Sequence, residues 1–334
     1  MLGSAISRLT LKMNAAPSDN LISIVIPAYN EEDVLHELHR RLKLVLNTLD
    51  MRHEIIYVDD GSKDATVEII KSFRANDPSV GLIKLSRNFG KEIALTAGLH
   101  GTLGDCVIVI DADLQDPPEL IPQMVAAWRE GAEVVNMRRN SRAGETLFKK
   151  WSAHTYYRIL NKLSDVPIPE DVGDFRLMSR KVIQALNALP ESNRYMKGLF
   201  AWVGFQQVTQ LYDRDARAAG LVKQNYPKLI GLALEGITSF SVKPLRIISL
   251  VGFMCALVAF GMTAFYLLKA IFMGDSVRGF PTLIVSLFFL GGLQLVSIGI
   301  LGEYLGRMFI ETKRRPLYFI DEQLLSHRPT GENK

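Results

Sequence analysis

The sequence predicts an α/β protein with a Rossmann-like, mainly parallel sheet, followed by two C-terminal transmembrane helices. Strand and helix patterns alternate over residues 21–110, which is typical of a parallel sheet with helices on both faces. Acidic side chains follow several of the strands. Two long apolar segments occupy the last third of the 334 residues, a length that exceeds one compact domain.

The elements can be expected in order along the chain. Strands are predicted at Leu21–Ile26, Glu54–Val58, Val80–Leu85, Cys106–Ile110 and Glu133–Met137. Helices are predicted from Asn30 to about Leu49, from about Asp64, over Lys91–His100 and over 118–130. The first of these helices carries acids in its first turn, as the helix dipole favours. A basic polar stretch follows at 138–150, helix resumes at about Trp151, and 171–178 passes from loop to strand.

The two ends of this region suggest boundaries. Residues 1–20 lack the long apolar core of a signal peptide, so a disordered extension is expected before a domain at 21–226. Residues 227–245 place apolar side chains near helical spacing directly before an apolar segment. That pattern predicts an interfacial helix lying on a membrane, with an ordinary soluble helix as the alternative.

Transmembrane helices are predicted at 246–272 and 280–306. Ile247–Leu268 and Phe280–Gly302 contain no charged residue, and about 20 residues suffice to cross a bilayer, so a pair of buried core helices is the weaker alternative. Basic residues flank the pair, including Lys243, Arg246 and Lys313–Arg315. Because positive charge favours the cytoplasmic side, the 21–226 domain and the 307–334 tail are both expected in the cytoplasm.

The small residues Gly302 and Gly306 permit close helix contact. Packing of the two spans against each other and a homo-oligomer are both compatible with this spacing.

Cysteine spacing, motifs and charge argue against several other classes of protein. Cys106 and Cys255 have neither disulfide nor zinc spacing, and no GxGxxG or GxxxxGK[ST] motif supports a dinucleotide oxidoreductase or a P-loop NTPase. The net charge of +4 is weak evidence for any partner, and no nucleic acid is expected.

Asp111, Asp113 and Gln115 follow the apolar run Cys106–Ile110. In open α/β sheets, ligands bind at the carboxyl ends of the strands. Carboxylate and amide oxygens suit Mg²⁺ or Mn²⁺, and a hard ion in this place usually serves a phosphate or diphosphate. The alternative is a turn with solvated acids.

Two further strand ends carry candidate ligand contacts. Pro27 and Tyr29 could form an apolar wall for a nucleobase, and Asp60 could accept from its N–H. The alternative is a pair of ordinary βα turns with helix caps. Lys91, at the start of a helix, could meet a phosphate or pair with Asp111, and a solvated lysine is the alternative.

Four segments together carry a family resemblance: Val25–Glu31, Asp59–Ser62, Ser86–Glu92 and Asp111–Pro118. They resemble glycosyltransferase family 2. Over about residues 21–320, the chain is similar to the membrane-bound polyisoprenyl-phosphate glycosyltransferases. These include bactoprenol glucosyltransferases, with dolichyl-phosphate-mannose synthase as a more distant relative. The resemblance implies a GT-A fold and a nucleoside-diphosphate-sugar donor.

The resemblance also implies roles for individual residues. The donor would meet Pro27, Tyr29, Glu31, Asp60, Lys91, Asp111, Arg217 and Lys223. Mg²⁺ or Mn²⁺ would meet Asp111, Asp113 and Gln115, the acceptor phosphate would meet Arg139, Arg142 and Lys149, and Asp174 would be the catalytic carboxylate. The segment 217–226 departs from the family pattern, because the small hydroxyl residue and the aromatic that adjoins the lysine are missing. The arginines at 138, 139 and 142 could also attract anionic lipid headgroups.

The activity implied is inverting transfer of one sugar to undecaprenyl or another polyisoprenyl phosphate at the cytoplasmic leaflet of a bacterial inner membrane. Glucose from UDP-glucose is the expected donor sugar, and cell-envelope or O-antigen modification the expected use. A phosphate with a second pKa of about 6 needs little general-base help, so Asp174 would orient the acceptor or take a residual proton. A processive polysaccharide synthase subunit is the alternative enzyme, for which two spans are few. An inactive membrane scaffold is the other alternative, disfavoured by the intact Asp111, Asp113 and Asp174.

Overall fold

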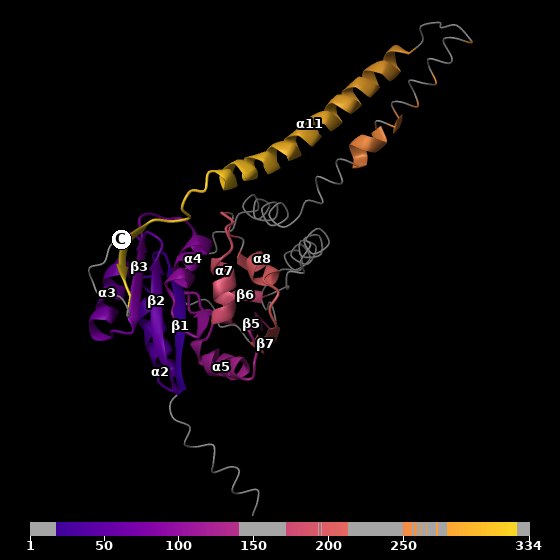
Figure 1. Cartoon of the computed structure of the whole chain (residues 1–334). Helices are drawn as coiled ribbons and strands as arrows, with labels where there is room; N and C mark the ends of the chain where they lie inside the picture. Colours follow the sequence, from indigo (N-terminus) through magenta and orange to yellow (C-terminus); the bar gives the residue numbers. More distant parts are fainter. Residues whose placement is uncertain are drawn as a thin grey trace, which may run out of the picture. The chain divides into compact units, whose positions relative to one another are not determined.

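A computed structural model describes residues 18–139, 172–192, 194, 196–212, 250–255, 257–258, 261, 265, 272 and 279–325. The described strands are β1 Ser18–Ala28, β2 Met51–Asp59, β3 Val80–Leu85, β4 Cys106–Val109, β5 Val134–Arg139, β6 Val172–Ser179, β7 Gln207–Tyr212 and β8 Ile320–Leu324 (Figure 1). The helices are α2 Leu35–Leu46, α3 Thr66–Asn76, α4 Lys91–Gly101, the 3₁₀ turn η2 Pro118–Leu120, α5 Ile121–Arg129, α7 Arg180–Asn187, α8 Met196–Trp202 and α11 Phe280–Thr312. The described residues form two compact units, one holding the sheet and the other holding α11.

The eight described strands form one sheet in the order β7-β5-β6-β4-β1-β2-β3-β8. β1 pairs in parallel with β2 and β4, β2 with β3, and β5 with β7. β6 is antiparallel to β4 and β5, and β8 is antiparallel to β3. The α/β class is therefore confirmed, but the sheet is mixed and only mostly parallel. Both antiparallel strands lie outside the strand–helix alternation of residues 21–110, from which the parallel sheet was predicted.

Helices cover both faces of the sheet. Ile22, Ile24 and Ile26 of β1 alternate onto one face, where they join a core with α2, α3 and α5. Val25 and Val58 point to the other face, against α4. A Cβ on Gly98 of α4 would lie 2.3 Å from Val25 Cγ1, so the absence of a side chain there lets the helix sit directly on the sheet.

Several strands and helices begin or end at other residues than the sequence predicts. β1 begins at Ser18, inside the predicted extension 1–20. α2 begins at Leu35 and not at Asn30, because Asn30 has a positive φ of 55° and residues 32–34 form a turn. The predicted 118–130 helix starts as the turn η2. The strand predicted at 133–137 runs to Arg139, so the basic stretch begins within β5. β7, α7, α8 and β8 were not predicted as separate elements.

α11 corresponds to the second predicted span and continues past residue 306 to Thr312. Within the described residues, Phe289–Thr312 is the one helix apolar and long enough to cross a membrane, and none of it is buried. The 33 residues of the whole helix α11 correspond to a length of roughly 50 Å at 1.5 Å per residue, which is more than the thickness of a hydrocarbon core, about 30 Å. The described residues of the first predicted span are helical, and its remainder lies outside the description, as do 227–245.

Candidate active site

A cavity of about 380 Å³ opens at the carboxyl edge of the sheet, where β1, β2 and β4 end. Seven residues singled out from the sequence line it: Pro27, Tyr29, Glu31, Asp60, Lys91, Asp111 and Asp113. Ala28, Asn88, Gly90, Ala94 and Ala112 complete the lining. Three strand ends that are far apart in the sequence therefore form one concave site.

The loops after β1 and β2 hold each other in place. The backbone N–H of Asn30 donates to Ser62 Oγ at 3.0 Å, and Asn30 Oδ1 accepts from the backbone N–H of Lys63 at 2.8 Å. The N–H of Glu31 donates to Thr66 Oγ1 at 2.9 Å. These bonds satisfy loop backbone groups with side chains of the neighbouring loop. The expected side-by-side arrangement of the two strand ends is confirmed.

Asp60 fixes the third loop of the cavity. Its two carboxylate oxygens accept from the backbone N–H groups of Phe89 and Gly90, at 2.7 and 2.9 Å. Burial raises the pKa of this carboxyl. Gly61 has a φ of 74°. A Cβ added at this position would lie 2.7 Å from the carbonyl carbon of Arg87, so a side chain has no room there. Asp60 thus shapes the cavity wall, and its interaction with a nucleobase stays a prediction.

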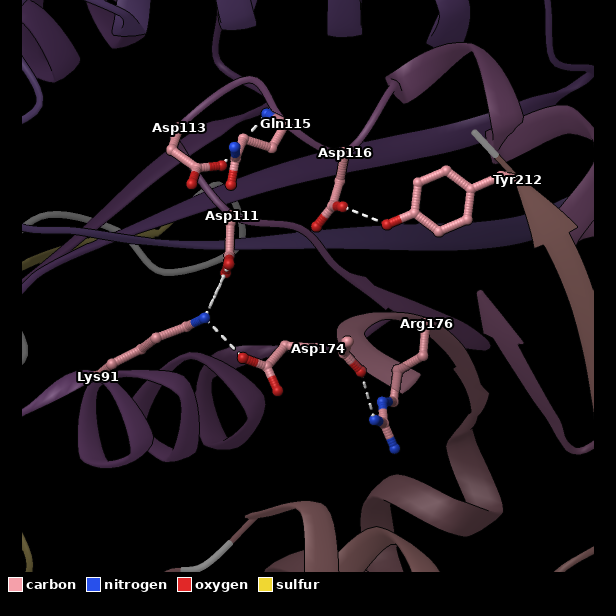
Figure 2. Close-up of polar contacts among 9 residues, drawn as sticks. Lys91, Asp111, Asp113, Gln115, Asp116, Asp174, Arg176 and Tyr212 are labelled. Carbon is pink, nitrogen blue, oxygen red and sulfur yellow. Dashed lines mark hydrogen bonds and ion pairs between the residues drawn. The ribbon is translucent and has the colours of Figure 1, made fainter. Parts of the chain in front are cut away.

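Lys91 connects Asp111, which lines the cavity, with Asp174 of β6, which is not among the lining residues (Figure 2). Its Nζ lies 2.7 Å from Asp111 Oδ1 and 2.6 Å from Asp174 Oδ2. Although burial opposes the charge, the carboxylates of Asp111 and Asp174 raise the pKa of Lys91. Burial likewise opposes ionisation of Asp174, yet the positive charges of Lys91 and Lys197 lower its pKa to about 2. Asp174 is therefore a carboxylate at neutral pH.

The strand direction explains why Asp174 reaches this place. β6 runs antiparallel to β4, so its N-terminal end lies at the carboxyl edge of the sheet. Alternation places Phe175 and Leu177 in the core with α2 and turns Asp174 and Arg176 to the face of α4. The antiparallel entry of β6 is what brings Asp174 beside Asp111.

Three charged residues near Asp174 were missed by sequence reasoning. Arg176 is 4% exposed, and burial lowers its pKa to about 10. Burial together with the charge of Asp174 raises the pKa of Glu92 to about 7. Lys197 of α8 is close enough for its charge to act on Asp174, and burial lowers its pKa. An arginine within the apolar run Phe175–Met178 was the signal available, because arginine is rarely buried without a partner.

The residues of the DxD segment fit a hard divalent cation. Asp111 and Asp113 both line the cavity, and Asp113 Oδ1 accepts from the backbone N–H of Gln115 at 3.2 Å. No set of three His, Cys, Asp or Glu side chains that could hold a metal occurs in the described parts of the chain. Two carboxylates would leave the remaining positions to water and diphosphate oxygens, which is how Mg²⁺ is commonly bound. Gln115 is described but does not line the cavity, so its ligand role stays a prediction.

The other predicted site residues lie at the end of a described segment or outside the described residues. The backbone of Arg139 ends β5 opposite Tyr212 of β7, and its side chain is outside the described atoms. Arg142, Lys149, Arg217 and Lys223 lie outside the described residues. Tyr212 donates through its hydroxyl to the buried Asp116, a contact that sequence reasoning did not identify and that ties β7 to the turn after β4.

Comparison with known proteins gives one family match and several similar proteins. Residues 23–186 match the model of the glycosyl transferase family 2. The chain is 48% identical over 301 residues to an uncharacterized glycosyltransferase of Synechocystis, covering 90% of this chain and 95% of that protein. It is 46% identical over 299 residues to the bactoprenol glucosyl transferase of Shigella phage SfX, covering 90% and 98%. A crystal structure of glucosyl-3-phosphoglycerate synthase from Mycobacterium tuberculosis aligns with a TM-score of 0.47 and 24% identity, covering 67% of this chain and 78% of that one.

Proposed function

The chain belongs to glycosyltransferase family 2, and from that membership we propose that it transfers one glucose from UDP-glucose to undecaprenyl or a related polyisoprenyl phosphate. The family membership makes it an enzyme with an α/β GT-A fold. The names of relatives such as the Shigella phage bactoprenol glucosyl transferases support the sugar and the lipid. The product would be a lipid-phosphate-linked glucose available for cell-envelope glycan modification.

The observation that carries the proposal is the meeting of Asp174 with the cavity carboxylates through Lys91. Donor binding would use the wall made by Pro27 and Tyr29 together with Glu31 and Asp60. Asp174 would lie on the acceptor side. One of its oxygens is bound to Lys91. The other is buried and has no hydrogen-bond partner among the described residues, and an acceptor group would supply that partner.

The reaction needs one nucleophile and one leaving group. An oxygen of the lipid phosphate attacks the anomeric carbon as the bond from that carbon to the UDP oxygen breaks, which inverts the anomeric centre. The phosphate is largely ionised at neutral pH because its second pKa is about 6. Asp174, also ionised, would take only a residual proton or fix the orientation of the acceptor. Lys91 would place positive charge near the developing diphosphate charge.

A divalent cation, Mg²⁺ or Mn²⁺, would be held by Asp111 and Asp113, with Gln115 as a further candidate. When bound, it would supply Lewis-acid stabilisation of the departing diphosphate. Lys91 Nζ contacts both carboxylate oxygens of Asp111, at 2.7 and 2.8 Å, and so limits the movement of that carboxylate. Asp113 is held by the N–H of Gln115.

The acceptor side extends to residues whose side chains are not described. We assign Arg139, Arg142 and Lys149 to the acceptor phosphate, because guanidinium groups bind phosphate through charge-assisted, often bidentate hydrogen bonds. Arg217 and Lys223 would close over the donor diphosphate. These assignments are supported by the family pattern at each position, less strongly at Lys223, where the motif departs from it.

The proposed site of action is the cytoplasmic leaflet of a bacterial inner membrane. The exposed apolar surface of α11 supports membrane insertion. The basic residues that flank the two predicted spans support cytoplasmic termini. A second copy of the chain is a further candidate partner, through the glycine-containing face of α11.

A donor panel tests the proposal. Purified full-length protein would be mixed with undecaprenyl phosphate, Mg²⁺ or Mn²⁺, and radiolabelled UDP-glucose, UDP-galactose or GDP-mannose. We expect label in a chloroform-soluble product with one sugar per lipid, and only from UDP-glucose. Asp174→Asn should lose transfer while UDP binding stays near that of the wild type. Long glycan products would support a processive synthase, and absence of transfer from every donor would contradict the proposal.

A further inference from the structure

The segment that carries Asp174 extends beyond the regular part of the sheet. Pairing between β4 and β6 ends at Val109 opposite Arg176. The pairing with β5 has an irregularity between Asn136 and Arg138 in the same place. The backbone around Asp174 is therefore not held by a regular ladder, and its polar groups need other partners.

Arg176 supplies such a partner (Figure 2). Its Nη2 donates to the carbonyl oxygen of Gly173 at 2.7 Å, in the peptide unit that directly precedes Asp174. The guanidinium carbon lies 3.8 Å from the centre of the Phe200 ring of α8. The hydrogen bond is charge-assisted and the ring contact is a cation–π interaction, so two directional contacts fix the guanidinium. The arginine in turn fixes the Gly173–Asp174 peptide.

Packing alone does not account for an arginine at this position. Its neighbours in β6, Phe175 and Leu177, are fully buried apolar residues, and Arg176 itself is 4% exposed. Its Nε has no hydrogen-bond partner among the described residues. Burying a guanidinium costs free energy that a leucine would not incur. The charge is balanced by Asp174 and Glu92, both on the active-site side of the sheet.

From these contacts we propose that Arg176 is a positioning residue for Asp174, acting through the Gly173 carbonyl to hold the carboxylate over the end of β4. Lys91 fixes the side chain of Asp174, and Arg176 fixes its backbone. Arg176 itself touches neither donor nor acceptor in this assignment. The inference rests on the proposed role of Asp174 in transfer and adds the residue that orients it.

Arg176→Lys and Arg176→Ala test the proposal, with Arg180→Lys as the matched control. Arg180 also donates to backbone carbonyls, to Gly104 and Thr102, but at the opposite end of β4. A lysine at 176 keeps the charge and loses the fixed geometry. We expect Arg176→Lys to lower kcat roughly 10- to 100-fold, the loss that corresponds to one charge-assisted hydrogen bond. UDP affinity by calorimetry should change little, and Arg180→Lys should keep the wild-type kcat.

Chemical rescue separates positioning from simple structural support. Millimolar guanidinium should restore part of kcat in Arg176→Ala and none in Asp174→Asn. A wild-type kcat in Arg176→Lys, an equal loss in Arg180→Lys, or a loss explained by weaker UDP binding would overturn the proposal. If Arg176→Ala does not fold, the kcat of Arg176→Lys decides the question. Wild-type transfer by Asp174→Asn would instead refute the role of Asp174, and absence of lipid-linked glucose from the wild type would refute the proposed function, so these failures are distinguishable.

Discussion

Lys91 Nζ lies 2.6 Å from Asp174 Oδ2, so the first residue of α4 and a residue of β6 meet although 83 positions separate them. The same ammonium lies 2.7 Å from Asp111 Oδ1. One ammonium thus pairs with two carboxylates that belong to different parts of the proposed reaction. Removing it should affect both stability and transfer.

Lys91→Met should destabilise the sheet unit by about 1–2 kcal/mol at pH 7, allowing for the partly exposed lysine. The pKa of Asp174 is about 2, below its ordinary value of 3.8. This stabilisation is therefore present above about pH 4 and is lost as the pH falls towards 2. Thermal melting of wild type and variant from pH 3 to 8 should show a difference that shrinks in acid. kcat should fall as well, because Asp174 loses its orientation.

Lys71→Met is the control for Lys91→Met. Lys71 pairs with Glu322 at 2.6 Å and is about as exposed as Lys91, but its partner Glu322 is 34% exposed, whereas Asp174 is 12% exposed. Exposed pairs contribute about 0–1 kcal/mol, so this variant should melt near the wild type at every pH and keep its activity. A pH-independent loss of equal size in both variants would refute the assigned role of Lys91.

The parts of the fold predicted best are those where local pattern and tertiary context agree. β3 has the predicted bounds Val80–Leu85, since a short apolar run between polar turns leaves little choice. The start of α2 was misplaced because acids after Asn30 resemble a first helical turn, whereas Asn30 itself takes a left-handed conformation. Strand direction was missed at β6, because sequence pattern does not encode which way a strand enters a sheet.

The candidate site likewise contains residues that could be predicted from the sequence and residues that could not. The cavity-lining residues of the first, second and fourth strand ends could be named, because parallel strands bring their carboxyl ends together. The pairing of Lys91 with Asp111 was one of three alternatives, beside a phosphate contact and a solvated lysine. Its contact with Asp174 was not predicted, and Asp174 was identified only through the family pattern. Glu92, Arg176 and Lys197 were missed because their burial depends on how α4, β6 and α8 pack.

Glu92→Gln should stabilise the protein at alkaline pH. Burial raises the folded-state pKa of Glu92 from 4.5 to about 7, so the folded state favours the protonated form. The contribution of Glu92 to the free energy of unfolding is therefore fully present below about pH 4.5 and is lost as the pH rises through 7. Glutamine does not titrate, so the variant should be more stable by about 1–3 kcal/mol at pH 8 and close to the wild type near pH 4.5. Melting temperatures at both pH values measure the difference.

Glu68→Gln, on the exposed side of α3, is the matched control and should show no such pH dependence. A Glu92→Gln variant that is less stable than the wild type at pH 8 would mean that the ionised carboxylate is favourable in the buried cluster. The effect of Asp174 on Glu92 would then be smaller than that of Lys91, Lys197 and Arg176.

Leu325→Ala should destabilise the sheet unit, although residues 307–334 were expected to form only a tail. β8 pairs with β3, Leu325 is 2% exposed, and its carbonyl accepts from Arg74 Nη2 at 3.1 Å. Truncating a buried leucine costs about 2–5 kcal/mol. Leu44→Ala, at a side chain 57% exposed, should change stability little. Equal melting temperatures for the two variants would show that β8 does not contribute to folding.

The orientation of the membrane segments can be tested by labelling. In a background without Cys106 and Cys255, Ser276→Cys should react with a membrane-impermeant maleimide in intact cells. Ser326→Cys should react only after permeabilisation, because the basic flanks favour a cytoplasmic C-terminus. Reaction of Ser326→Cys in intact cells, with protection of Ser276→Cys, would invert the proposed topology.

Asp113→Asn should weaken Mn²⁺ binding at least tenfold and lower transfer to a similar extent, while the fold is kept. Asp113 lines the cavity beside Asp111, and a neutral amide is a poorer ligand for a hard cation than a carboxylate. Calorimetric titration of Mn²⁺ in the presence of UDP measures affinity separately from turnover. Asp105→Asn, at the opposite end of β4, where Asp105 accepts from the backbone N–H of Leu21, should bind Mn²⁺ like the wild type. Full transfer by Asp113→Asn in EDTA would show that the reaction needs no cation at this carboxylate.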